Sequence, residues 1–149
     1  MPKKLLIALI SLGTISFLVF GVLGESSFKS SLATAVLGGE TLSLEVADTP
    51  SLRQKGLSGH PPLGDHEGML FVFPEEGLHS FWMKDMLFPI DIIWLDREYR
   101  IVDVWERADP KSYPQAVSPR LPARFVVELP AGFFQEHNLK VGNILEITR

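Results

Sequence analysis

The sequence predicts a mainly β protein, in which a compact antiparallel β-barrel or β-sandwich with two short helices follows an N-terminal membrane helix. Apolar or alternating runs of strand length, about seven in number, recur between turn residues, as in β-strands joined by loops. No βαβ rhythm separates these runs, and short strands without that rhythm are typical of barrels and sandwiches. A long uncharged segment at the N-terminus predicts the membrane helix.

Residues 1–24 are interpreted as a signal-anchor or a signal peptide. Lys3 and Lys4 precede an uncharged run from Leu5 to Gly24, which as a helix would span roughly 30 Å, the thickness of a bilayer core. This run is longer than the usual apolar region of a cleaved signal, which favours an anchor and leaves cleavage as the alternative. Either way we expect the rest of the chain outside the cytoplasm, membrane-anchored or, after cleavage, periplasmic or secreted.

A Ser- and Gly-rich stretch, residues 25–40, predicts a linker. Residues 41–149 then form a single β-rich domain, because a chain of 149 residues has room for only one core of ordinary size. Residues 41–48 alternate apolar and polar side chains, as in a half-buried strand. Thr49 and Pro50 predict the N-cap and first turn of a short helix over residues 50–57.

The next segments predict strands over residues 68–73 and 79–85, and a hairpin over residues 89–107 with its turn near Arg97 and Glu98. A loop with four prolines follows, from Asp109 to Pro122, and loops of this length are often functional. Residues 124–129 predict a strand, residues 131–138 a short helix, and residues 143–148 the closing strand.

Composition excludes several classes of function. The chain has no cysteine, which removes disulfides, thiolate metal sites and cysteine nucleophiles. Its net charge is -4 and no Lys/Arg cluster stands out, so we expect no nucleic-acid partner. A loop with His60, Asp65, His66 and Glu67 contains metal-ligating residue types, but such loops are more often solvated turns, and we expect neither a metal nor a cofactor.

Charged side chains within the apolar strands are the candidate site. Asp91 shares a strand face with Ile93 and Leu95, and a carboxylate in such a row is either exposed at the strand end or paired. Lys84 and Arg53 are its candidate partners, and we expect Lys84 and Asp91 to form one polar cluster. Glu128 lies on the strand face opposite Val127. Its side chain therefore belongs either to an exposed, charge-paired surface or to a functional site.

A family resemblance rests on four segments: "VADTPSLRQKGLSG", "GMLFVFPEEGLHSFWMKDMLFPIDIIWLD", "ARFVVELPAG" and "KVGN". In this order they resemble the bacterial and archaeal family catalogued as domain of unknown function 192, over roughly residues 42 to 147. The resemblance implies a compact, mostly β domain without established activity, often behind a signal peptide or anchor. The family pattern falls on Arg53, Gly56, Leu57, Gly68, Met69, Phe71, Phe81 to Lys84, Asp91, Asp96, Glu128 and Gly132. The chain departs from it at Asp85 and Asn143, where the family usually has Asn and Asp.

Three functions remain open from the sequence. The first is a non-catalytic, envelope-facing module that binds a small ligand or an envelope protein, with the membrane as a partner through the N-terminal helix. Its candidate ligand-binding residues are Arg53, Trp82, Lys84, Asp85, Asp91 and Glu128, with Trp94 and Trp105 as further aromatic candidates. The alternatives are an enzyme acting on envelope glycan or peptide, with Asp85, Asp91 or Glu128 as acid/base residues, and a purely structural module.

Overall fold

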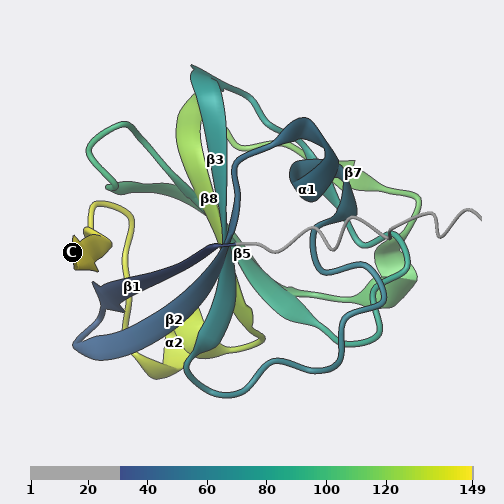
Figure 1. Cartoon of the computed structure of the whole chain (residues 1–149), viewed down its shortest axis with the longest axis horizontal. Coiled ribbons are helices and arrows are strands. Elements are labelled where there is room, and N and C mark those ends of the chain that lie inside the picture. The colour runs from purple at the N-terminus through teal and green to yellow at the C-terminus, as the bar shows by residue number, and fades with distance from the viewer. Residues whose placement is uncertain (1–30, 149) are drawn as a thin grey trace, which may run out of the picture.

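The computed structural model describes residues 31–148 (Figure 1), so the predicted membrane helix and the first part of the predicted linker lie outside the described residues. Within this range no helix is both long and apolar enough to span a bilayer. The elements are β1 Ser31–Leu37, β2 Glu40–Ala47, α1 Pro50–Lys55, β3 Glu67–Gly77, β4 Phe81–Trp82, β5 Ile90–Leu95, β6 Ile101–Ala108, the 3-10 helix η1 Pro110–Ser112, β7 Ala116–Val117, β8 Ala123–Pro130, α2 Phe133–Glu136 and β9 Glu146–Thr148.

The first hairpin corrects the predicted linker. Gly38 and Gly39 both have positive φ angles, 62° and 88°, which suits the two-residue turn that joins antiparallel strands. The turn pairs β1 with β2 from Leu37 opposite Glu40 to Ser31 opposite Val46. Residues 31–37, assigned to the linker because their small and polar side chains show no clear period, therefore belong to the sheet.

Seven strands form one mixed sheet in the order β6-β5-β8-β3-β2-β1-β9, and β4 pairs with β7 in a small second sheet. The prediction of a mainly β protein with two short helices is confirmed, but the antiparallel barrel or sandwich is wrong. Strands β2 and β3 are parallel, because the connection through α1 carries the chain back before β3 begins. The sheet remains open, with β6 and β9 at its edges. The segments just before these strands meet through a bridge between Arg100 and Ile144 and a few backbone hydrogen bonds, without pairing β6 to β9.

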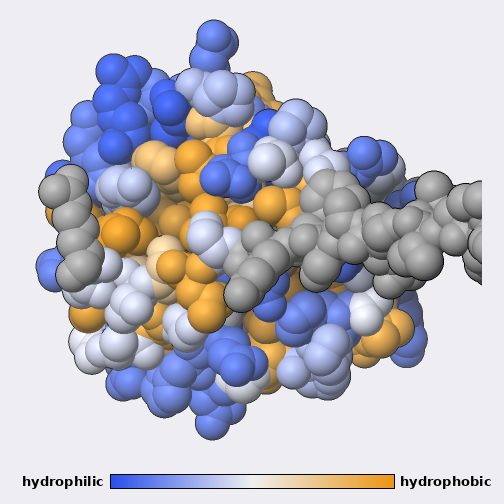
Figure 2. Space-filling model, viewed as in Figure 1, coloured by the Kyte–Doolittle hydropathy of each residue, from blue (hydrophilic) through white to orange (hydrophobic). Residues whose placement is uncertain are grey.

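Apolar side chains cover both faces of the central strands. Alternate residues of β8 belong to two separate clusters, with Val127 and Leu129 in one and Val126 in the other, as the side-chain period of a strand requires. All six residues of β5 are buried. Figure 2 shows that the surface is mixed, with apolar side chains near the middle of one face and hydrophilic ones around much of its margin.

Local signals in the sequence place several elements correctly. The Thr49 hydroxyl accepts a hydrogen bond from the Leu52 N–H at 3.2 Å and caps α1. In the β5–β6 hairpin, the Asp96 carboxylate accepts from the N–H groups of Glu98 and Arg100, each at 2.9 Å. The strand predicted over residues 79–85 is only two residues long, because the chain leaves β4 after Trp82 and enters a loop.

Candidate functional site

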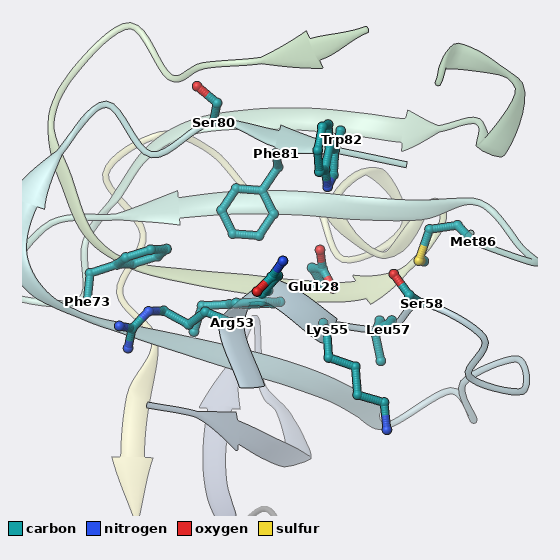
Figure 3. Close-up of a pocket in the computed structure, with 13 residues that line it drawn as sticks. Arg53, Lys55, Leu57, Ser58, Phe73, Ser80, Phe81, Trp82, Met86 and Glu128 are labelled. Carbon is teal, nitrogen blue, oxygen red and sulfur yellow. The ribbon is translucent and has the colours of Figure 1, made fainter. Parts of the chain in front are cut away.

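A cavity of about 220 Å³ lies between α1, the middle of β3, β4 and β8 (Figure 3). Its walls combine the segment from Arg53 to Ser58 with aromatic side chains of β3 and β4. Glu128 of β8 lies among them and points toward Phe81 and Trp82. The cavity thus joins three segments that are far apart in the sequence.

An edge-to-face network of rings builds the aromatic wall. The Phe81 ring centroid lies 4.9 Å from that of Phe71, 6.4 Å from that of Phe73 and 5.9 Å from that of Trp94. Such pairs add about 0.5–1.5 kcal/mol beyond the burial of their surface, so they fix the orientation of Phe81. Phe71 is 1% exposed, whereas Trp82 is 52% exposed and forms part of the mouth.

Strand pairing places Glu128 in the middle of the main sheet. Its neighbours across the strands are Met69 of β3 and Ile92 of β5. The close approach of β3 requires the glycine at position 68, because a Cβ there would lie 2.5 Å from the Glu128 carbonyl oxygen. The exposed, charge-paired surface that the sequence left open for Glu128 is therefore wrong, since only 5% of the residue is exposed.

The Glu128 carboxyl group has no hydrogen-bond partner in the described part of the chain. Within residues 31–148, its buried Oε2 atom makes no hydrogen bond, although buried carboxyl groups are normally paired. Burial alone raises the pKa of Glu128 to about 8, because desolvation disfavours the charged form. At neutral pH the group is therefore mostly a neutral carboxylic acid beside the aromatic rings of the cavity.

The basic residues of α1 line the cavity with their stems and direct their charges elsewhere. One guanidinium nitrogen of Arg53 donates to the carbonyl oxygens of Asp48, at 2.6 Å, and Val72, at 2.8 Å. The same guanidinium lies over the Phe73 ring, 5.3 Å from its centroid. Figure 3 shows the Arg53 and Lys55 head groups pointing away from Glu128.

Lys84 and Asp85 follow β4 and do not line this cavity. The Lys84 amino nitrogen lies 5.9 Å from the centroid of the Trp82 ring, within the range of a cation–π contact. Asp85 has a φ of 56° and accepts a hydrogen bond from the Gly59 N–H through its main-chain carbonyl. Both residues line a neighbouring hollow, which includes Ser58 of the cavity wall.

The predicted cluster of Lys84 and Asp91 is not formed. Asp91 is fully buried and accepts hydrogen bonds from three backbone N–H groups: those of Arg107 and Gly132 on one oxygen and that of Phe134 on the other, at 2.7 to 3.0 Å. These donors surround the start of α2. Asp91 is therefore a structural cap in the described part of the chain, and backbone amides take the place of the expected basic partner.

The histidine-containing loop forms pairs of side chains rather than a metal cluster. The His60 ring lies 3.3 Å from the Glu45 carboxylate, and the His66 ring lies 3.7 Å from that of Glu40. No group of three His, Cys, Asp or Glu side chains in residues 31–148 has the arrangement of a metal site.

Sequence reasoning named Arg53, Trp82 and Glu128, which the structure brings together at one cavity. It missed Phe73, Met86 and the half-buried Phe81 as residues that line the cavity. Trp94, another aromatic candidate, is 1% exposed and belongs to the core. A strand pattern cannot separate these roles, because an aromatic residue facing a cavity and one facing the core occupy the same alternating positions.

A family model described as "Uncharacterized ACR", domain of unknown function 192 (DUF192), matches residues 33–147. A UPF0127 protein of Thermococcus gammatolerans is 31% identical over 107 residues, which make up 68% of this chain and 64% of that protein. A UPF0127 protein of Thermococcus sibiricus is 29% identical over 108 residues, 69% of this chain and 64% of that protein. The chain thus spans a little under two thirds of the length of these curated relatives.

Two solved structures share the fold. One, from Sinorhizobium meliloti, is described as a proposed transcription regulator; it has a TM-score of 0.74 and 28% identity, over 80% of this chain and 95% of its own. The other is a protein of unknown function from Novosphingobium aromaticivorans, with a TM-score of 0.72 and 26% identity, over 83% of this chain and 89% of its own.

Proposed function

Because the chain belongs to DUF192, a family described as uncharacterised, we propose a function from the geometry of the domain itself: the cavity at Glu128 is a binding site for a small ligand. The observation that carries this proposal is the Oε2 atom of Glu128, which has no hydrogen-bond partner among residues 31–148 and is buried against an open cavity with a partly aromatic lining. A buried polar group without a partner costs about 1–3 kcal/mol. A ligand that supplies the missing partner recovers part of that cost.

Binding without catalysis agrees best with the residues around the cavity. Within the described chain, Glu128 is the only carboxyl group among the lining residues, whereas acid/base hydrolysis of glycans uses two carboxyl groups. The lining serines are also engaged: Ser58 donates to the Lys84 carbonyl oxygen, and Ser80 shares a hydrogen bond with Ser118. An enzyme with Asp85 or Asp91 beside Glu128 is therefore the weaker alternative.

The location we propose is the outer face of the cytoplasmic membrane. The support is the uncharged segment from Leu5 to Gly24 behind two lysines, which together have the pattern of an exported, anchored chain. The proposed regulatory role of the Sinorhizobium relative does not extend to this chain in our proposal, because its acidic composition does not favour contact with nucleic acid.

The binding proposal is tested by fluorine NMR of the full chain in lipid nanodiscs, with its three tryptophans replaced by 5-fluorotryptophan. A panel of small neutral and charged fragments is titrated into the sample. We expect at least one fragment to shift the Trp82 resonance and leave that of Trp105, which does not line the cavity, in place.

Two truncations localise the binding site, with affinity measured by calorimetry. Trp82→Ala removes part of the mouth and should weaken binding at least tenfold. The matched control, Leu121→Ala, removes a similarly exposed apolar side chain, 55% against 52% exposed, and should leave affinity unchanged. The proposal would be contradicted if no fragment shifts the Trp82 resonance, or if both variants lose the same amount of affinity.

A further inference from the structure

The interior of the cavity presents one ionisable carboxyl group and the faces and edges of several aromatic rings. We infer that its ligand carries an organic ammonium group, which the cavity holds between the Glu128 carboxylate and the rings of Phe81 and Trp82. This inference rests on the proposed binding function and names the chemical class of its ligand.

Charge complementarity within the cavity is the first support. Aromatic faces attract cations, and the chain already uses the lining rings in this way: Arg53 lies over Phe73, and Lys84 lies over Trp82. An ammonium ion placed in the cavity meets the same kind of ring together with a carboxylate. Among the described residues, no other group that lines the cavity can provide a negative charge.

The positions of the nearby basic groups agree with this choice. Of the elements packed around Glu128, α1 contributes Arg53 and Lys55, and their head groups point away from the carboxyl group (Figure 3). Strand β3 contributes Phe71 and Phe73 to the lining and no ionisable side chain. Lys84, after β4, lies outside the lining. An anionic ligand placed beside Glu128 would therefore meet its carboxyl group, while the Arg53 and Lys55 head groups are directed elsewhere.

The protonation state of Glu128 predicts the direction in which ligand affinity changes with pH. The free group is mostly protonated at pH 7, because burial raises its pKa to about 8. A bound cation favours the ionised form, so binding releases a proton and strengthens as the pH rises toward 8. A neutral ligand that accepts a hydrogen bond from the protonated acid would show the opposite dependence.

The test compares choline with its neutral isostere 3,3-dimethylbutan-1-ol by calorimetry on the full chain in phosphatidylglycerol nanodiscs. The quaternary nitrogen does not titrate, and phosphatidylglycerol carries no ammonium group. We expect choline to bind at least tenfold tighter than the alcohol at pH 7 and to release close to one proton. Its affinity should rise about tenfold per pH unit from pH 6 to near 8 and then level off.

Glu128→Gln keeps the size of the side chain and removes its charge, so it should lower choline affinity at least tenfold and abolish the pH dependence. Glu106→Gln, a matched change at a residue that does not line the cavity, should do neither. Proton release by the unmodified chain tests the inference even if the first variant does not fold.

The possible results distinguish a failure of the ammonium assignment from a failure of the proposed binding function. Equal binding of choline and the alcohol, with Trp82 shifting for both, would overturn the ammonium assignment and leave the cavity as a binding site. Absence of choline binding would also overturn the assignment, and the fragment panel then decides the binding function separately. Phosphatidylcholine nanodiscs that compete with free choline would support the assignment and identify a lipid headgroup as the source of the ammonium.

Discussion

Glu128 is the residue on which the functional proposal depends. A carboxyl group at this position contributes little to folding, because it is buried and has no hydrogen-bond partner among the described residues. An apolar side chain of similar size would avoid the cost of burying a polar group, which is about 1–3 kcal/mol in protein mutational data. Residues that weaken a fold in this way are typical of functional sites.

The raised pKa of Glu128 predicts how stability changes with pH. The pKa is about 8 in the folded chain, against a model value of 4.5, so between these values the folded state binds more protons than the unfolded state. Its contribution to stability therefore falls as the pH rises from about 4.5 to 8, by roughly 4–5 kcal/mol, and is constant outside that window.

Urea unfolding of the full chain and of Glu128→Gln, measured from pH 4 to 9, isolates this effect, because the other titrating groups are common to both proteins. The variant should gain stability relative to the unmodified chain as the pH rises to about 8. A stability difference that does not change with pH would mean that Glu128 is solvated or paired in solution.

At the scale of elements, α2 shows how a short helix is held in place. It has four residues, too few for an isolated helix to be stable. Asp91 on β5 accepts hydrogen bonds from the N–H groups of Gly132 and Phe134 at its start, and Phe133 is buried against the core. The helix therefore depends on a carboxylate from a strand far away in the sequence.

This arrangement predicts that substitutions of Asp91 and Lys84 differ in their effect on stability, although the sequence predicted that the two residues form one cluster. Asp91→Asn replaces one accepting oxygen by a donor that faces backbone N–H groups, and should lower the free energy of unfolding by about 2–4 kcal/mol. Lys84→Met should change it by about 0.5 kcal/mol or less, as for an exposed side chain. In a double-mutant cycle measured by urea unfolding the two effects should add. Coupling well above about 1 kcal/mol would restore the cluster expected from the sequence.

The sequence predicted those elements whose signals are local. The Thr49 cap and the hairpin around Asp96 follow from residues within four positions of each other. Strand β1 was missed because Ser31–Leu37 has the composition of a linker, and it becomes a strand only when β2 and β9 pair with it on either side. The extent of β4 was overestimated because "HSFWMKD" has strand propensity, whereas only Phe81 and Trp82 find partners, in β7.

At the scale of the whole molecule, the central sheet is covered on both faces. Alternation along β8 correctly placed Glu128 opposite Val127 and Leu129, but it could not show that the second face is also covered. That cover comes from α1, β4 and the loops around them, which lie around the cavity (Figures 1 and 3). The cavity therefore depends on the parallel crossover through α1, which local sequence patterns did not predict.

The central claim is that Glu128 is a buried carboxyl group, without a partner among residues 31–148, at a cavity open to ligands. The most direct measurement is a carbon-13 NMR titration of its side-chain carboxyl group in the full chain labelled at glutamate, assigned by comparison with Glu128→Gln. The account predicts a midpoint near 8, and a lower midpoint when a ligand with an ammonium group is bound. A midpoint near the ordinary glutamate value of about 4.3 would contradict it.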